Sequence, residues 1–152
     1  MKPIALASDH AGFQAKEAVK AVLRELGIPF RDYGTHSEDS CDYPDFAAQA
    51  ARAVSEGESE RAILACGSGT GMAMVANKFP GVRAAACHDE WCARMSRMHN
   101  DANVLALGGR VLGAEAVQQM VRLWLDTPFE GGRHSRRVAK IADLERCHEA
   151  KP

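Results

Sequence analysis

Short apolar runs alternate along this chain with longer segments in which apolar residues recur every three or four positions. The short runs predict five β-strands, at residues 4–7, 28–33, 61–66, 82–86 and 104–107. The longer segments predict amphipathic helices that begin or end at Gly27, Pro44 and Gly57. Strands that alternate with helices form a parallel sheet covered on both faces. We therefore expect a doubly wound, Rossmann-like α/β fold with five parallel strands.

The remaining helices are expected in the second half of the chain. A short helix is predicted from about residue 70 to 77, and another carries Trp91, Met95 and Met98. The next has the i, i+3, i+4, i+7 spacing of a buried face, in Val117, Met120, Val121 and Trp124. The segment from about 136 to 147 carries more basic than acidic residues, and a C-terminal basic helix is predicted there.

Composition limits the possible functions. The chain has 152 residues, with 19 Lys and Arg against 20 Asp and Glu, and a formal net charge of −1. This length fits one domain over residues 1–152, and the balanced charge gives no support for binding nucleic acid or an anionic membrane. No apolar run approaches the roughly 18 residues of a membrane helix, and no signal-peptide pattern follows Met1. We expect a cytoplasmic protein that acts on a small molecule.

The five cysteines, at positions 41, 66, 87, 92 and 147, are odd in number and irregularly spaced. This pattern differs from a disulfide framework and indicates a reducing compartment. Cys87, His88 and Cys92 are close in sequence, but they lack the paired spacing of a zinc site. We expect neither a metal nor a cofactor.

One cysteine stands directly before a glycine-rich turn. The third predicted strand ends at Cys66, and Gly67, Ser68, Gly69, Thr70 and Gly71 follow it. Because glycine lacks Cβ, the amides of this turn can converge on an anion, and a helix that begins near Thr70 adds its positive end. A thiol beside such a turn ionises readily, so Cys66 is a candidate base or nucleophile. The alternative is a buried structural cysteine, which would not require three alternating glycines after it.

Spacing argues against four other uses of this turn. Met72 occupies the third glycine position of the dinucleotide fingerprint, and no Lys-Ser or Lys-Thr pair completes a Walker motif. A cysteine phosphatase would place an arginine inside the loop. Redox chemistry would need a CxxC partner, which this chain lacks. Thiol redox and phosphatase chemistry are therefore the least favoured functions.

Several more clusters carry polar or glycine residues: Ser8-Asp9-His10, Asp42-Tyr43-Pro44, His99-Asn100-Asp101, Gly108-Gly109-Arg110 and Gly131-Gly132-Arg133-His134, with Arg137 nearby. With the turn after Cys66 and with Ala76-Asn77-Lys78-Phe79, they resemble the ribose-5-phosphate isomerase B family, which includes galactose-6-phosphate and allose-6-phosphate isomerases. The resemblance covers nearly the whole chain. It implies an aldose–ketose isomerase that interconverts ribose 5-phosphate and ribulose 5-phosphate through an enediolate.

The resemblance also implies roles for individual residues. Cys66 matches the family's proton-abstracting base, and His99 matches its acid/base for opening the sugar ring. The matched substrate-binding positions are Asp9, His10, Gly67, Ser68, Gly69, Thr70, Gly71, Asn100, Arg110, Arg133 and Arg137, and Tyr43 lies in a motif near them. Some members carry serine at the base position and use a glutamate on the next helix. Residues 67–77 contain no carboxylate, so this chain resembles the branch with a cysteine base.

Structural alternatives exist for the residues outside the turn. Asp9 could cap the first helix, and His99 could interact with the negative end of its own helix. The arginines at 133, 136 and 137 could form a solvated face, although residues four apart project to the same side of a helix and suit a phosphate dianion. Tyr43 could simply contact the loop. The resemblance favours the functional interpretation for each.

The order of the predicted elements constrains the site. Cys66 ends the third strand, whereas His99 and Asn100 precede the fifth, so in a parallel sheet they lie at opposite edges. The length of a strand separates the two edges, roughly five residues with a rise of about 3.3 Å each. If both serve one sugar, His99 and Asn100 come from a second copy of the chain. We therefore expect a homodimer with shared active sites, and pairing of dimers into tetramers stays open.

Three rival functions differ in what they need. Allose-6-phosphate isomerase activity differs from ribose-5-phosphate isomerase activity by the reach of one carbon. Galactose-6-phosphate isomerases of the family divide functional positions between two different subunits, whereas this chain keeps both Cys66 and His99. A non-catalytic sugar-phosphate sensor would need the arginines and the glycine turn but no base.

Overall fold

The computed structural model describes residues 1–149. The strands are β1 (Ile4–Ser8), β2 (Phe30–Asp32), β3 (Ala62–Cys66), β4 (Ala84–Ala86) and β5 (Val104–Gly108). The helices are α1 (Phe13–Glu25), α2 (Tyr43–Ser55), α3 (Thr70–Ala76), α4 (Glu90–Met98), α5 (Ala114–Asp126) and α6 (Arg133–Glu149). All strand pairs are parallel, in the order β2-β1-β3-β5-β4. The predicted fold class is confirmed.

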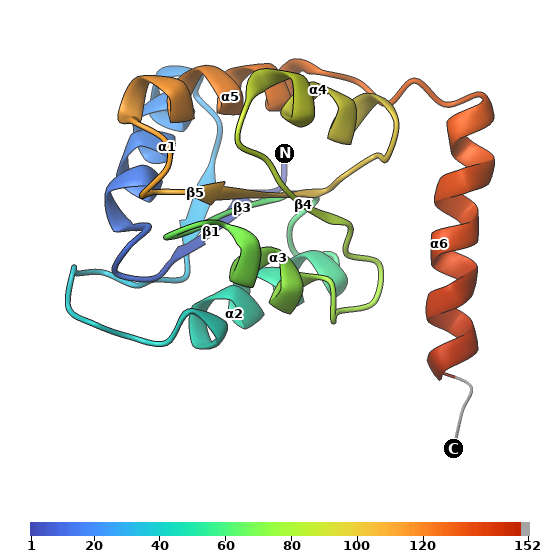
Figure 1. Cartoon of the computed structure of the whole chain (residues 1–152), viewed down its shortest axis with the longest axis horizontal. Coiled ribbons are helices and arrows are strands. Elements are labelled where there is room, and N and C mark those ends of the chain that lie inside the picture. Colours follow the sequence, from blue (N-terminus) through green and yellow to red (C-terminus); the bar gives the residue numbers. More distant parts are fainter. Residues whose placement is uncertain (150–152) are drawn as a thin grey trace.

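Helices cover both faces of the sheet, with α1, α4 and α5 on one face and α2 and α3 on the other (Figure 1). Successive strand residues point to opposite faces. Leu6, Ile63 and Leu105 therefore contact the first layer of helices. The second face is rich in alanine, including Ala5 and Ala106, and these small side chains allow α2 and α3 to lie close to the sheet.

The two edge strands are shorter than the sequence predicts. β2 spans Phe30–Asp32 rather than residues 28–33. Pro29 has no N–H to donate to a neighbouring strand, and only its carbonyl forms a hydrogen bond, which it accepts from Ile4 N. β4 spans Ala84–Ala86 rather than residues 82–86. In α4 the buried residues are Ala93, Ser96 and Arg97, whereas Trp91 is 70% exposed.

Helix α6 stands apart from the rest of the chain, beyond the β4 edge of the sheet (Figure 1). His134 is its only buried residue among those described. The Glu145 carboxylate joins it to the body of the protein by accepting from Gly81 N at 3.0 and 3.1 Å. None of the helices within residues 1–149 combines the length and apolar character needed to cross a membrane.

Candidate active site

The carboxyl ends of β1 and β3 form the topological switch point of the sheet. β1 and β3 are neighbours, but the chain continues from β1 to β2 on one side and from β3 towards β5 and β4 on the other. In open α/β sheets, ligands bind at such a point. The turn after β5 joins it, because Gly109 N donates to Cys66 O at 2.7 Å and Arg110 N donates to Gly67 O at 3.1 Å.

Cys66 is the last residue of β3 and is 5% exposed. Its Sγ accepts a hydrogen bond from Gly69 N at 3.1 Å. Gly69 has a φ of +80°, a left-handed conformation that turns the chain back over the thiol before α3 begins at Thr70. The sulfur therefore lies directly beneath the glycine turn, and a main-chain donor that faces it stabilises negative charge on it.

Three loops meet so closely around Cys66 that side chains are excluded from the contacts. A Cβ on Gly12 would lie 2.2 Å from Ala65 O, and a Cβ on Gly109 would lie 2.6 Å from Ala11 O. These neighbours are main-chain atoms and have little freedom to move. The glycines at these positions allow the loops after β1, β3 and β5 to touch through their backbones.

Two large side chains border the glycine turn. The Arg110 side chain lies over Gly67, with Nη1 3.5 Å from where a Cβ would be, and the Tyr43 ring lies 2.6 Å from the corresponding point on Gly71. Arg110 is exposed, and Tyr43 is 38% exposed. The structure therefore brings Arg110 and Tyr43 to the turn of their own chain.

Asp9 and His10 follow β1 and both hold loops in place. Asp9 is buried, and its Oδ1 accepts from Gly12 N at 2.9 Å, so it stabilises the turn that leads into α1. The helix cap itself is Gly12. His10 Nδ1 accepts from Cys41 N at 3.2 Å, which ties His10 to the loop that precedes α2.

The other sequence-predicted residues lie elsewhere. Cys66 pairs with Gly108 at the carboxyl edge of the sheet, and Ala62 pairs with Val104 at the amino edge. His99 and Asn100 precede Val104, so within one chain they lie at the edge opposite to Cys66. Arg133 and Arg137 are exposed on α6.

His99 belongs to a cluster that the sequence does not reveal. It lies at the end of α4, where its ring stacks on that of His134 with the centroids 4.2 Å apart and an interplanar angle of 11°. Glu130 Oε2 lies 3.7 Å from His99 Nε2 and 3.3 Å from His134 Nε2. Burial, followed by the nearby His99, lowers the pKa of His134.

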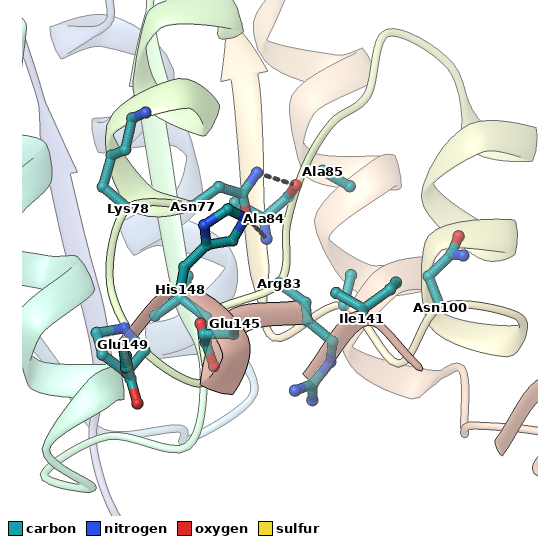
Figure 2. Close-up of a pocket in the computed structure, with 13 residues that line it drawn as sticks. Asn77, Lys78, Arg83, Ala84, Ala85, Asn100, Ile141, Glu145, His148 and Glu149 are labelled. Carbon is teal, nitrogen blue, oxygen red and sulfur yellow. Dashed lines mark hydrogen bonds between the residues drawn. The ribbon is translucent and has the colours of Figure 1, made fainter. Parts of the chain in front are cut away.

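An open cavity of about 820 Å³ separates α6 from the edge of the sheet (Figure 2). Asn100 lies along one side of it, and α6 contributes Ile141, Glu145 and His148. The opposite wall includes Asn77, whose side-chain amide exchanges two hydrogen bonds with the backbone of Ala84, at 2.8 and 3.0 Å.

Cys87, His88 and Cys92 do not form a joint site. Cys87 is buried, and burial raises its pKa to about 11, whereas His88 is exposed. Within residues 1–149, one group of three potential metal ligands has its ligand atoms close together. It consists of His99, Glu130 and His134.

Comparisons with known proteins agree with the fold and with the motifs. The chain is 47% identical to ribose-5-phosphate isomerase B of Escherichia coli K12, over 95% of this chain and 97% of that protein. It is 40% identical to D-erythrulose-4-phosphate isomerase of Pectobacterium atrosepticum, over 95% and 96%. The crystal structure of Mycoplasma genitalium ribose-5-phosphate isomerase B with bound ribulose-5-phosphate is 38% identical, with a TM-score of 0.91 and coverage of 95% and 96%. The family described as Ribose/Galactose Isomerase matches residues 4–141. The chain belongs to this family of sugar isomerases.

Proposed function

We propose that this protein interconverts ribose 5-phosphate and ribulose 5-phosphate, with Cys66 as the base. The observation that carries the proposal is the hydrogen bond of 3.1 Å from Gly69 N to the Cys66 sulfur at the switch point of the sheet. A thiolate can move a proton between two adjacent carbons, and converging amides stabilise the oxyanion that forms beside it. The relative with bound ribulose-5-phosphate supports the substrate class.

The reaction has two stages. In the first, His99 takes the proton from the C1 hydroxyl of the furanose and delivers a proton to the ring oxygen, so the C1–O4 bond breaks and the aldehyde forms. In the second, the Cys66 thiolate takes the proton from C2, and the electron pair forms the enediolate. The proton on O2 moves to O1, the thiol returns its proton to C1, and the ketose results. No electrons leave the substrate.

A second copy of the chain would supply His99 to this site. Within one chain, His99 lies at the sheet edge opposite to Cys66. Helix α6 exposes Ile141 (51%) and Leu144 (62%) and leaves a cavity of about 820 Å³ beside its own sheet, so its apolar side chains have space for a partner. A homodimer with shared sites accounts for both features.

The phosphate group would bind to arginines. Arg133 and Arg137 are exposed and four residues apart on α6, so both guanidinium groups project to one side of the helix. Paired guanidinium groups suit a phosphate dianion. In a dimer, α6 of one copy would carry these groups, with His99, towards the Cys66 turn of the other.

Two assays separate the two stages. Ribulose 5-phosphate has no furanose form, because its C5 oxygen is phosphorylated, so deuterium uptake at C1 in D2O requires the base but no ring opening. Cys66→Ala should lose both this exchange and the turnover of ribose 5-phosphate, by at least about 100-fold. His99→Ala should lose turnover of ribose 5-phosphate and retain the exchange. Cys92→Ala, a cysteine outside the proposed site, should leave both rates unchanged. Full activity of Cys66→Ala would overturn the proposal.

Subunit exchange tests the shared site. Mixed dimers of Cys66→Ala and His99→Ala contain one site with both native residues and should recover part of the wild-type activity. No recovery after exchange is demonstrated by mass spectrometry would contradict the shared site.

Two other functions are tested by the same material. The preferred sugar is identified by comparing turnover of ribose 5-phosphate, allose 6-phosphate, galactose 6-phosphate and erythrose 4-phosphate. Erythrose 4-phosphate is included because one relative is named for the corresponding ketose, erythrulose 4-phosphate. A sensor would bind ribose 5-phosphate without converting it. Both assays include a chelator.

A further inference from the structure

Three metal-binding side chains converge at the amino edge of the sheet, far from Cys66. His99 ends α4, Glu130 lies in the connection after α5, and His134 is the second residue of α6. The backbone holds them together: Glu130 N donates to Met98 O at 3.1 Å, beside His99. Gly131 and Gly132 have φ of +68° and +57°, so the chain turns sharply between Glu130 and His134.

The distances between the ligand atoms are close to those of a tetrahedral metal site. Ligands bonded at about 2.1 Å to a tetrahedral Zn²⁺ lie about 3.4 Å from one another. Glu130 Oε2 is already 3.3 Å from His134 Nε2 and 3.7 Å from His99 Nε2, and all three atoms lie within 4.8 Å of one another. Because the two rings are stacked, one must tilt for both nitrogens to face a single ion. His99 has this freedom, since its side chain is 38% exposed at a helix end.

An independent observation is that the buried nitrogen in the cluster has no hydrogen-bond partner within residues 1–149. His134 is 6% exposed, and its Nε2 makes no hydrogen bond, although it faces the Glu130 carboxylate. Buried polar atoms of this kind are rare in folded proteins and call for an explanation.

We infer that His99, Glu130 and His134 form a three-ligand site for a divalent cation of the Zn²⁺ class. Two imidazoles and one carboxylate suit Zn²⁺, and its surrogate Co²⁺, better than Mg²⁺ or Ca²⁺, which prefer oxygen ligands. Glu130 is 52% exposed, so the ion has a path from solvent and a position for a water ligand. The guanidinium groups of Arg133 and Arg137 act on the same histidine, and their charge limits the affinity.

The site has a consequence for activity that rests on the proposed role of His99. An ion bound to His99 Nε2 occupies the lone pair that would accept the proton during ring opening. Zn²⁺ would therefore inhibit turnover of ribose 5-phosphate reversibly. It would leave deuterium exchange at C1 of ribulose 5-phosphate intact, because that step uses Cys66. Because the cation would act as an inhibitor, this metal site is compatible with a catalytic mechanism that uses no metal.

The test is titration of the chelator-stripped, full-length protein with Co²⁺ in phosphate-free buffer, followed by optical spectroscopy and competition with Zn²⁺. We expect one equivalent per chain, with the visible bands of a nitrogen and oxygen site and without a sulfur charge-transfer band. Glu130→Gln and His134→Gln should each weaken binding at least about tenfold. His88→Gln and Cys92→Ser, a histidine and a cysteine outside the cluster, should leave the titration unchanged.

Each other outcome is decisive. Absence of binding, a thiolate band, or binding that persists in Glu130→Gln and disappears in Cys92→Ser would overturn the site. Glu130→Gln replaces an exposed carboxylate with an amide of the same shape, so the test stands even if His134→Gln does not fold. Zn²⁺ bound at the cluster with full turnover of ribose 5-phosphate would contradict the role of His99 and leave the metal site in place.

Discussion

Substitution of Gly12 by alanine should damage both the stability and the activity of this protein. The added Cβ would lie 2.2 Å from Ala65 O, whereas a carbon and a carbonyl oxygen normally stay about 3.3 Å apart. The loop after β1 must therefore move about 1 Å from β3. Gly12 has a φ of −96°, which alanine tolerates, so the effect comes from the contacts of the Cβ with the main chain of Ala65 and Cys66.

The expected size follows from the displacement. Overpacking costs about 1 to 3 kcal/mol, and the upper end applies because main chain meets main chain. For a chain of this length, about 3 kcal/mol lowers the melting temperature by about 6 to 12 °C. A shift of about 1 Å beside Cys66 should lower kcat about 100-fold. Urea denaturation and the C1 exchange assay measure the two effects separately.

Gly113→Ala is the matched control. Gly113 also precedes a helix as its N-cap, with a φ of −76°, but its Cβ would meet nothing within 4 Å. Gly113→Ala should lower the free energy of unfolding by less than about 1 kcal/mol, because alanine is a poorer N-cap residue than glycine. If Gly12→Ala is as stable and as active as Gly113→Ala, the argument that backbone contact shapes the site is refuted.

Two further predictions concern the buried ion pair between Lys16 and Asp32. Lys16 is 1% exposed, and its Nζ donates to Asp32 Oδ1 at 2.8 Å and to Thr35 O. Lys16→Met should therefore lower the free energy of unfolding, measured by urea denaturation, by about 3 kcal/mol. A loss as small as that of the control Lys140→Met, at an exposed lysine, would contradict this. Burial alone would raise the pKa of Asp32, but hydrogen bonds from Lys16 and Gly34 N and the ion pair with Lys20 outweigh it and hold the pKa below the usual 3.8. The ionised carboxylate therefore stabilises the fold above that pH, and this stability is lost as pH falls through the lower, folded pKa. The wild type should lose stability more steeply than Asp32→Asn below about pH 4, and equal slopes would refute the assignment.

The sequence predicts the sheet and the position of Cys66 well because both depend on local patterns. An apolar run that ends at a glycine turn marks a strand end wherever it occurs, and the structure places Cys66 and Thr70 at the expected boundaries. The opposite positions of Cys66 and His99 follow from strand direction alone. Features that depend on neighbours distant in sequence are less accessible.

Glu130 and Lys16 illustrate what sequence reasoning misses. Glu130 approaches His99 because two left-handed glycines turn the chain between α5 and α6. The only local signal is a glutamate and a histidine four residues apart around a Gly-Gly pair. Lys16 is buried because the carboxylate of β2 and the carbonyl of Thr35 surround its ammonium group, and no helical pattern predicts those partners. Trp91 is exposed because α4 turns Ala93, Ser96 and Arg97 towards the sheet instead.

The strand order constrains when this chain can fold during synthesis. Within the described residues 1–149, β4 pairs with β5 alone, and β5 lies between β3 and β4. A nascent chain that has emerged as far as β4 therefore has a strand whose neighbour is still missing, whereas the neighbours of β1 and β2 are all present. The ribosome must release residues up to Gly108 before the gap is filled. Until then the unpaired edges of β3 and β4 are open to other strands, which makes the arrival of β5 the step that commits this chain to its native topology.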